Sequence, residues 1–243
     1  MKNYAVLSDL HGNLQAAQAV AEDMKYNSIQ GMILLGDLID YGMQSNEMIC
    51  FLQQKLNDKV ICSLWGNHES AIMMSDFTGF SSKRGADCAK RTAGLLDGNA
   101  RKYLDEELIH EGIFEFNLEA KKCLAVHGSL ADPYWLPITP DTQNGYYDSY
   151  DIVFSGHSHK PHAFAKYYDC DNPGMRNKHA VLFLNPGSVG QPRNHNPNAQ
   201  YMILDTETMS VNMRSVPYDV DQAMSLFTED IDDFYCRRLK SGV

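Results

Sequence analysis

The chain of 243 residues has little positive charge and no cysteine framework. Lys and Arg number 21 against 31 Asp and Glu, which gives a formal net charge of -10. Because nucleic acids and anionic membranes attract positive charge, we expect neither of them as a partner. The six cysteines show no CxxC spacing, and several lie in apolar runs, as small core residues do.

Long apolar runs and nucleotide-binding glycine motifs are missing as well. No run approaches the roughly 18 residues of a membrane-spanning helix. The N-terminus enters an apolar strand pattern without the basic and apolar regions of a signal peptide. We therefore expect a cytoplasmic protein. No GxGxxG follows a strand, which argues against a dinucleotide-binding protein. No linker or repeat divides the chain, so we expect a single domain over residues 1–243.

The first part of the chain alternates short apolar runs with amphipathic helical patterns. The predicted order is strand 4–7, helix 14–26, strand 32–35, helix 45–56 and strand 59–65. A polar residue follows each strand, and the distances are 37 − 9 = 28 residues from Asp9 to Asp37 and 67 − 37 = 30 from Asp37 to Asn67. One βαβ unit has about 30 residues. Three successive units therefore place polar residues at one edge of a parallel sheet.

Residues 71–110 interrupt this rhythm, and strand patterns follow them. Helical patterns at 86–96 and 100–107 are separated by glycines and predict an inserted helical cap. A hairpin is predicted over residues 113–118 and 121–126. Residues 132–148 fit no periodic pattern. The remaining predictions are strands at 152–154, 163–168, 180–184, 201–204 and 210–216, and a helical segment at 219–239.

Histidines gather at the predicted strand ends. Five of the nine lie there, beside glycine, aspartate or asparagine: His11, His68, His127, His157 and His159. Each cluster alone has a plain alternative. Asp9 or Asp37 could be a turn or cap aspartate, His127 a core histidine, and Gly66-Asn67 a turn that caps the next helix. The joint occurrence favours one shared site over several unrelated turns.

Five motifs in order carry a family resemblance: Asp9-x-His11, Gly36-Asp37-x-x-Asp40, Gly66-Asn67-His68-Glu69, His127-Gly128 and Gly156-His157-x-His159. This set resembles the calcineurin-like metallophosphoesterase superfamily, and residues 185–193 resemble its small bacterial phosphodiesterase branch. The resemblance implies an α/β fold, a four-layer α/β/β/α sandwich of two mixed sheets. We expect that fold with a small helical insert at about 71–110.

The resemblance also implies two divalent metal ions per chain. One would be held by Asp9, His11, Asp37 and His159, and the other by Asp37, Asn67, His127 and His157, with Asp37 bridging. Mixed oxygen and nitrogen ligands suit Mn²⁺, Fe, Zn²⁺, Co²⁺ or Ni²⁺.

The implied reaction is hydrolysis of a phosphoester by attack of a hydroxide that bridges the two metals. His68, which is not a ligand, is expected to protonate the leaving alkoxide as a general acid. By the resemblance, Asp40 holds the ring of His68 and favours its protonated form.

One departure narrows the expected substrate. Protein Ser/Thr phosphatases of the superfamily carry an arginine where this chain has Tyr41. We therefore expect a small-molecule phosphodiester or nucleotide as substrate. A dinucleoside polyphosphate hydrolase and a protein Ser/Thr phosphatase are the alternatives. A catalytically silent scaffold of the same fold is the alternative outside enzymes, and the intact ligand set argues against it.

Expected substrate contacts are Asn67, Arg193 and, in the insert, Arg84 and Arg91. Six basic residues of the insert lie within 20 positions, against Asp87 and Asp97, so the local charge is 6 − 2 = +4. Arginine suits forked contacts to phosphate oxygens, so we predict a cationic wall over the metal site. The alternative is a solvated face whose charges pair with acids elsewhere.

Overall fold

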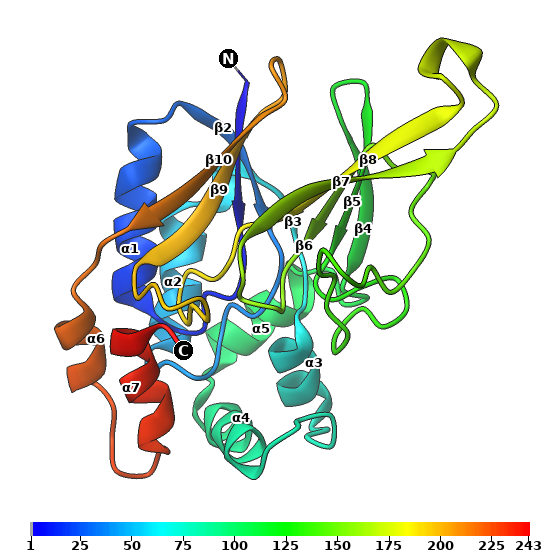
Figure 1. Cartoon of the computed structure of the whole chain (residues 1–243). Coiled ribbons are helices and arrows are strands. Elements are labelled where there is room, and N and C mark those ends of the chain that lie inside the picture. The colour runs from blue at the N-terminus through cyan, green and yellow to red at the C-terminus, as the bar shows by residue number, and fades with distance from the viewer. Residues whose placement is uncertain (1) are drawn as a thin grey trace.

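The computed structural model describes residues 2–243 and contains two five-stranded sheets (Figure 1). The first sheet has the order β10-β9-β1-β2-β3. It consists of β1 (Asn3–Leu7), β2 (Ile29–Leu34), β3 (Val60–Ser63), β9 (Ala199–Asp205) and β10 (Ser210–Val216). The first three strands are parallel, and β9 and β10 run antiparallel to their neighbours. The predicted βαβ rhythm is confirmed.

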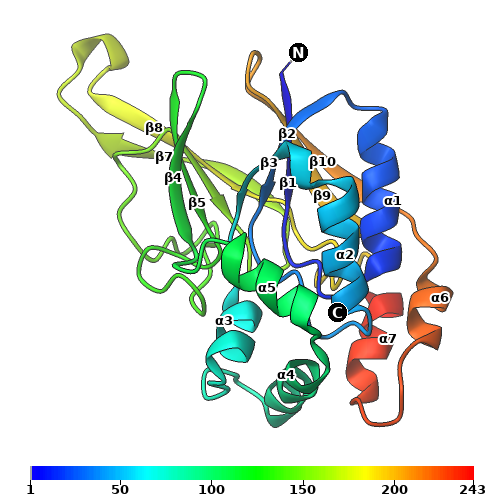
Figure 2. The same ribbon diagram turned by 180° about the vertical axis from the view of Figure 1, so that it is seen from behind.

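Two helices connect these parallel strands and cover the outer face of the first sheet (Figure 2). They are α1 (Leu14–Lys25) and α2 (Ser45–Lys55), and a short 3-10 turn, η1 (Asn57–Lys59), leads into β3. The side chain of Asn13 accepts a hydrogen bond from the backbone N–H of Ala16, which caps the start of α1. Val20 and Met24 lie on the buried face of α1, as the helical spacing predicts.

The second sheet has the order β4-β5-β6-β8-β7. Its elements are β4 (Ile113–Leu118), β5 (Lys121–Val126), β6 (Ile152–Ser155), β7 (His162–Asp169), the 3-10 turn η2 (Pro173–Met175) and β8 (Lys178–Asn185). The predicted hairpin is confirmed: β4 and β5 pair antiparallel over the expected residues.

Successive side chains in the strands of the second sheet point to opposite faces and so contribute to two separate apolar cores. Cys123 and Ala125 pack against residues of the first sheet, while Leu124 and Val126 point to the opposite face. That outer face is covered by side chains from the loop after β5, among them Tyr147, in place of a helix. The two mixed sheets nevertheless confirm the predicted fold class.

The helical insert is present, but it begins earlier than expected. Its helices are α3 (Asn67–Met74), α4 (Lys83–Leu95) and α5 (Gly98–Glu106). The first of these starts at Asn67, inside the Gly-Asn-His-Glu motif, and not near residue 71. Ser82 and Asp97 cap the other two helices with their side chains.

The C-terminal segment contains two short helices in place of one continuous run. They are α6 (Val220–Ser225) and α7 (Asp233–Ser241), and aspartates cap both. Tyr235 of α7 shares an apolar cluster with Cys88 of α4. Figures 1 and 2 show α7 and the insert helices at the edge of the first sheet where β1 ends. Among residues 2–243, no helix has the length and apolar character needed to span a membrane.

Candidate metal centre

The polar residues that follow five strands converge at one edge of the two sheets. Two groups of side chains bring their ligand atoms within 4.8 Å of one another: Asp9, His11, Asp37 and His159 form the first, and Asp37, His127 and His157 the second. Asp37 belongs to both. All of these side chains are buried except His157, which is partly exposed. The residues expected to hold metal are therefore neighbours in space.

Asn67 completes the second group. Its Oδ1 atom lies 3.1 Å from Nε2 of His127 and 2.9 Å from Nδ1 of His157. Because α3 begins at Asn67, the start of this helix places the amide oxygen among the histidines.

Backbone carbonyls fix the orientation of all four histidine rings. Each ring nitrogen that faces away from the cluster lies near a carbonyl oxygen: His11 Nδ1 at 3.3 Å, His127 Nδ1 at 2.6 Å, His159 Nδ1 at 2.6 Å and His157 Nε2 at 3.2 Å. Since a carbonyl only accepts, these nitrogens carry the ring proton. The opposite nitrogens then present lone pairs to the cluster.

The resulting arrangement fits a cation. Nε2 of His11 and Nε2 of His159 lie 3.2 Å apart, so two lone pairs face each other. Both carboxylate oxygens of Asp9 and Oδ2 of Asp37 are buried without a hydrogen-bond partner among residues 2–243. Burial raises the pKa of Asp9 to about 7, because the charged form loses its hydration. Buried acceptors of this kind need a partner, and a divalent cation meets all of them at once.

Most of the candidate ligands have an uncommon backbone conformation. The φ angle is positive at five of them: Asp9 (55°), His11 (48°), Asp37 (53°), His157 (62°) and His159 (56°). This left-handed region is unfavourable for residues other than glycine. Hydrogen bonds between the loops hold it in place, for example from the N–H of Asp9 to the carbonyl of Gly36, at 3.0 Å.

Glu69 joins two of the ligand loops. Its buried carboxylate accepts hydrogen bonds from the N–H groups of Asp37 (2.8 Å), Leu38 (2.7 Å), Ile39 (3.2 Å) and Gly66 (2.8 Å). A side chain at Gly66 would not fit, since its Cβ would lie 2.1 Å from Oδ1 of Asp37. The sequence showed Glu69 in its motif but gave no signal for its role, because most of its partners lie about 30 residues away.

His68 lies beside the cluster and belongs to neither ligand group. Its Nδ1 atom is 2.6 Å from Oδ2 of Asp40, and its Nε2 atom is 3.9 Å from Oδ2 of Asp37. Burial lowers the pKa of His68, but the negative charges of Asp37 and Asp40 outweigh burial and raise it above the ordinary value. The site therefore favours the protonated imidazole.

Three aromatic residues, Tyr41, Phe80 and Trp135, surround the histidines, and only Tyr41 was singled out from the sequence. The ring of Tyr41 lies 4.6 Å from that of His11, 4.4 Å from that of His68 and 4.4 Å from that of Tyr235, centroid to centroid. The ring of Phe80 lies edge-on to that of His68, with 5.1 Å between the centroids. It also lies edge-on to the ring of Trp135, at the same centroid distance. Phe80 and Trp135 lie in segments without periodic pattern, so no sequence signal identifies them.

Arg193 and Arg84, both expected to bind substrate, differ in their contacts. The backbone N–H of Arg193 donates to the carbonyl of His159. Burial and the Arg193 guanidinium lower the pKa of the His159 ring. Arg84 lies over the ring of Phe234, with Cζ 3.9 Å from the centroid.

Two basic residues of the insert, Arg91 and Lys83, have acidic partners. The guanidinium of Arg91 donates to Asp230 at 2.5 Å. Lys83 pairs with Asp87 in the same helix. These contacts match the alternative of a solvated face whose charges pair with acids.

The amino-acid sequence is similar to those of known proteins over most of its length. The chain is 30% identical over 231 residues to an uncharacterized protein of Methanocaldococcus jannaschii, with 90% of this chain and 89% of that protein covered. It is 24% identical over 208 residues to the phosphodiesterase YfcE of Escherichia coli, with 84% and 88% covered.

Solved structures show the same fold at low sequence identity. A metallophosphoesterase from Sphaerobacter thermophilus superposes with a TM-score of 0.75 at 22% identity, covering 100% of this chain and 99% of the other. A hypothetical protein from Pyrococcus horikoshii gives 0.76 at 22% identity with the same coverage. The model of the calcineurin-like phosphoesterase superfamily domain matches residues 2–209. The chain therefore belongs to the calcineurin-like phosphoesterase superfamily and is a metal-dependent phosphoesterase.

Proposed function

We propose that the protein hydrolyses a small-molecule phosphodiester or nucleotide with two divalent ions held at the candidate metal centre. One ion is assigned to Asp9, His11, Asp37 and His159, and the other to Asp37, Asn67, His127 and His157. The observation that carries this proposal is the position of Asp37. Its Oδ2 atom has no hydrogen-bond partner among residues 2–243 and lies 3.7 Å from Nε2 of His11 and 3.4 Å from Nε2 of His127.

The donor set supports several ions. It contains carboxylate, amide and imidazole groups and no thiolate, which suits Mn²⁺, Fe, Zn²⁺, Co²⁺ or Ni²⁺. Such ions supply Lewis-acid chemistry, since they activate water and neutralise charge on phosphoryl oxygens.

The protein's own groups supply the proton. His68 is assigned as the general acid that protonates the leaving oxygen, and Asp40 as the residue that orients its ring. Proton donation of this kind contributes about 10²- to 10⁴-fold to the rate. Asn67 and Arg193 are assigned to the phosphoryl group, because both lie at the cluster and offer N–H donors.

Two observations favour a small substrate. Tyr41 occupies the place beside His11 and His68 with a neutral, buried ring and offers no cation to a phosphoprotein. The relative YfcE is described as a phosphodiesterase. A dinucleoside polyphosphate fits the same centre. A silent scaffold would not need the complete set of buried donor atoms. All six cysteines are free thiols, which supports a reducing compartment such as the cytoplasm.

The test is a metal-reconstituted assay. The chelated protein is loaded separately with each of the five ions and given bis(p-nitrophenyl) phosphate, followed by natural phosphodiesters, dinucleoside polyphosphates and a phosphopeptide. We expect cleavage of the diester with at least one ion and two metals per chain by mass spectrometry. His110→Ala serves as the control histidine, since its side chain is 42% exposed, bonds to Asp105, stacks on Trp65 and belongs to neither ligand group. Absence of turnover with every ion and substrate would refute the proposal.

A further inference from the structure

We propose that Arg84, Arg193 and Arg238 form a second anion site beside the metal centre, which binds the distal phosphates of a substrate that carries two or more phosphate groups. The inference rests on the proposed function and narrows its substrate class to polyphosphorylated nucleotides and related esters. It also gives the C-terminal helix a part in substrate binding.

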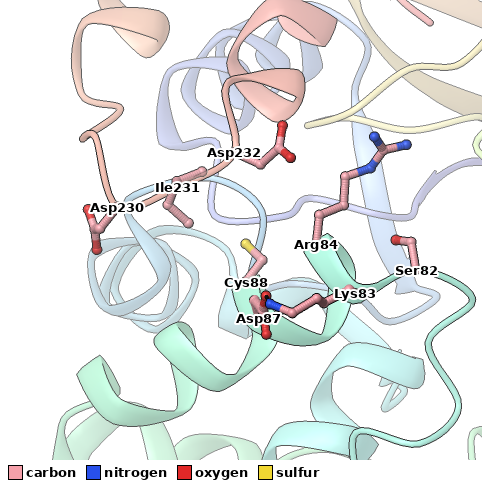
Figure 3. A pocket seen from close by; sticks show the side chains of 8 residues that line it. All are labelled: Ser82, Lys83, Arg84, Asp87, Cys88, Asp230, Ile231 and Asp232. Carbon is pink, nitrogen blue, oxygen red and sulfur yellow. Dashed lines mark hydrogen bonds and ion pairs between the residues drawn. The ribbon is translucent and has the colours of Figure 1, made fainter.

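The three arginines come from segments far apart in the sequence. Arg84 and Arg238 meet near the start of α7, and the loop that carries Arg193 contacts Gly242 at the end of that helix. Arg84 belongs to α4, Arg193 to the loop before β9 and Arg238 to α7. Cζ of Arg84 lies 3.9 Å from the ring centroid of Phe234, and Cζ of Arg238 lies 4.3 Å from the same centroid. Figure 3 shows Arg84 extending away from α4. One aromatic ring therefore holds two of the guanidinium groups.

Two of these charges have no acidic partner. Within residues 2–243, neither Arg84 nor Arg193 makes an ion pair with a carboxylate, whereas Arg91 and Arg214 do. Nε of Arg238 donates to the backbone oxygen of Val243. The Nε atom of Arg193 is buried and has no hydrogen-bond partner in that part of the chain. Burial, with the charges of Arg193 and Arg84, lowers the pKa of Arg238 to about 10. A group of three cations, two of them without an ion pair, in a chain of net charge -10 points to an anionic ligand.

The arginine group adjoins the metal centre. Arg193 lies next to the ligand loop, since its backbone N–H donates to the carbonyl of His159. Tyr41 stacks on Tyr235 of α7 at 4.4 Å and lies against His11 at 4.6 Å. A phosphoryl group at the metal centre thus has the arginines next to it, and further phosphates along the chain extend towards them.

The neighbouring pocket is a weaker candidate for the same ligand. It has a volume of about 570 Å³ between α4 and the C-terminal segment (Figure 3). Its lining consists of Ser82, Lys83, Arg84, Asp87, Cys88, Asp230, Ile231 and Asp232. Of its two cations, Lys83 is paired with Asp87, and Arg84 belongs to the arginine group. Because three aspartates line the rest of this pocket, we assign the anion site to the arginine group at its border.

The experiment compares two esters with the same leaving group: the p-nitrophenyl ester of thymidine 5′-monophosphate and that of thymidine 5′-triphosphate. The variants are Arg84→Gln and Arg238→Gln. Arg237→Gln is the matched control, because Arg237 is exposed on the same helix and pairs with Asp233. We expect both variants to raise KM for the triphosphate ester about tenfold more than for the monophosphate ester. The difference should shrink with added salt, and the control should change neither KM.

Equal changes in KM for the two esters in both variants would overturn the proposal. Arg238 also donates to the backbone oxygen of Val243 at 2.9 Å, so thermal unfolding is used to check that Arg238→Gln is folded. If Arg238→Gln does not fold, Arg84→Gln still tests the proposal, because Arg84 is exposed.

A binding measurement separates this inference from the proposed function. Calorimetry on chelated, metal-free protein should show that tripolyphosphate binds more tightly than orthophosphate, and that Arg84→Gln removes the difference. If the wild-type protein cleaves neither ester with any ion, the proposed function is refuted, and this measurement still decides the anion site. Equal affinity for the two anions in the wild type would refute the site.

Discussion

Nδ1 of His68 lies 2.6 Å from one carboxylate oxygen of Asp40. The other oxygen of Asp40 accepts a hydrogen bond from the hydroxyl of Thr92, at 2.5 Å, in helix α4 of the insert. All three side chains are buried. The insert therefore does more than cover the core, because one of its helices orients the carboxylate that orients the assigned general acid.

Substitution of His68 should separate proton donation from metal binding. His68→Ala is expected to keep its metal content and to lose about 10²-fold in kcat on an alkyl phosphodiester. The loss should be much smaller on a p-nitrophenyl diester, because a leaving group with a low pKa needs no proton. Metal analysis and kcat on both esters check this. Equal losses on the two esters, or loss of metal, would contradict the assignment.

Thr92 is expected to act as a positioning residue. Thr92→Val leaves one buried oxygen of Asp40 without its donor, which costs about 1–3 kcal/mol of stability and frees the His68 ring. The rate on the alkyl diester should fall several-fold more than the rate on the aryl diester. Thr92→Ser keeps the hydroxyl and should show wild-type rates on both diesters. A Val variant that is destabilised but shows the same loss on both esters would assign Thr92 a structural role alone.

Substitution of Asp37 should lower the metal content more than substitution of a candidate ligand that belongs to only one of the two ligand groups. Asp37→Asn removes charge from the oxygen that faces both groups of ligands. We expect it to lower the metal content below that of His157→Ala, which affects one group only. Mass spectrometry of the folded proteins gives the comparison. Two ions per chain and near-normal turnover in Asp37→Asn would exclude the bridging role.

Gly66 leaves room for Asp37. In Gly66→Ala, the new Cβ would lie 2.1 Å from Oδ1 of Asp37, so the carboxylate must move. We expect reduced metal content and loss of turnover. Gly98→Ala is the control, since nothing lies within 4 Å of its added Cβ and alanine favours the helix. The prediction fails if both variants bind metal like the wild type.

An ion pair remote from the centre should make stability depend on pH. Arg214 donates to both oxygens of Asp23, at 3.0 and 2.7 Å, and lowers the pKa of Asp23 below its ordinary 3.8. The stabilisation of the fold by this ion pair is therefore complete above pH 3.8, and it is lost as the pH falls through the folded-state pKa of Asp23. Asp23→Asn should cost about 1.5 kcal/mol at pH 7.

Urea unfolding at pH 7 and at pH 3 checks this, with Asp221→Asn as the control. Asp221 meets Lys240 only at 3.9 Å on an exposed surface, and such pairs contribute little. The stability difference between the wild type and Asp23→Asn should shrink at the lower pH. A difference that is unchanged or larger at pH 3 would contradict the linkage.

The convergence of Asp9, Asp37 and Asn67 at one sheet edge could be predicted because it follows from local patterns. An apolar run that ends in Asp9 or Asp37 identifies a strand and its carboxyl end at once. Parallel strands then bring those ends together without any knowledge of distant contacts. The hairpin of β4 and β5 was predicted with its bounds for the same reason, since its partners are adjacent in the chain.

Contacts between distant segments could not be predicted in this way. Arg91 and Asp230 are 139 residues apart, and nothing in the pattern of either segment indicates the other. Tyr41 was identified as a departure, but its stacking on Tyr235 depends on how α7 packs. The start of α3 at Asn67 agrees with the alternative in which Gly66-Asn67 caps the next helix, whereas the insert was expected only from about residue 71.

The left-handed conformation of five candidate ligands has a consequence for the history of the chain. At those positions the backbone alone would favour glycine or asparagine, so aspartate and histidine persist there only while selection on the chemistry continues. A descendant released from that selection could gain stability by exchanging them one at a time. At these positions the backbone would not oppose decay of the centre.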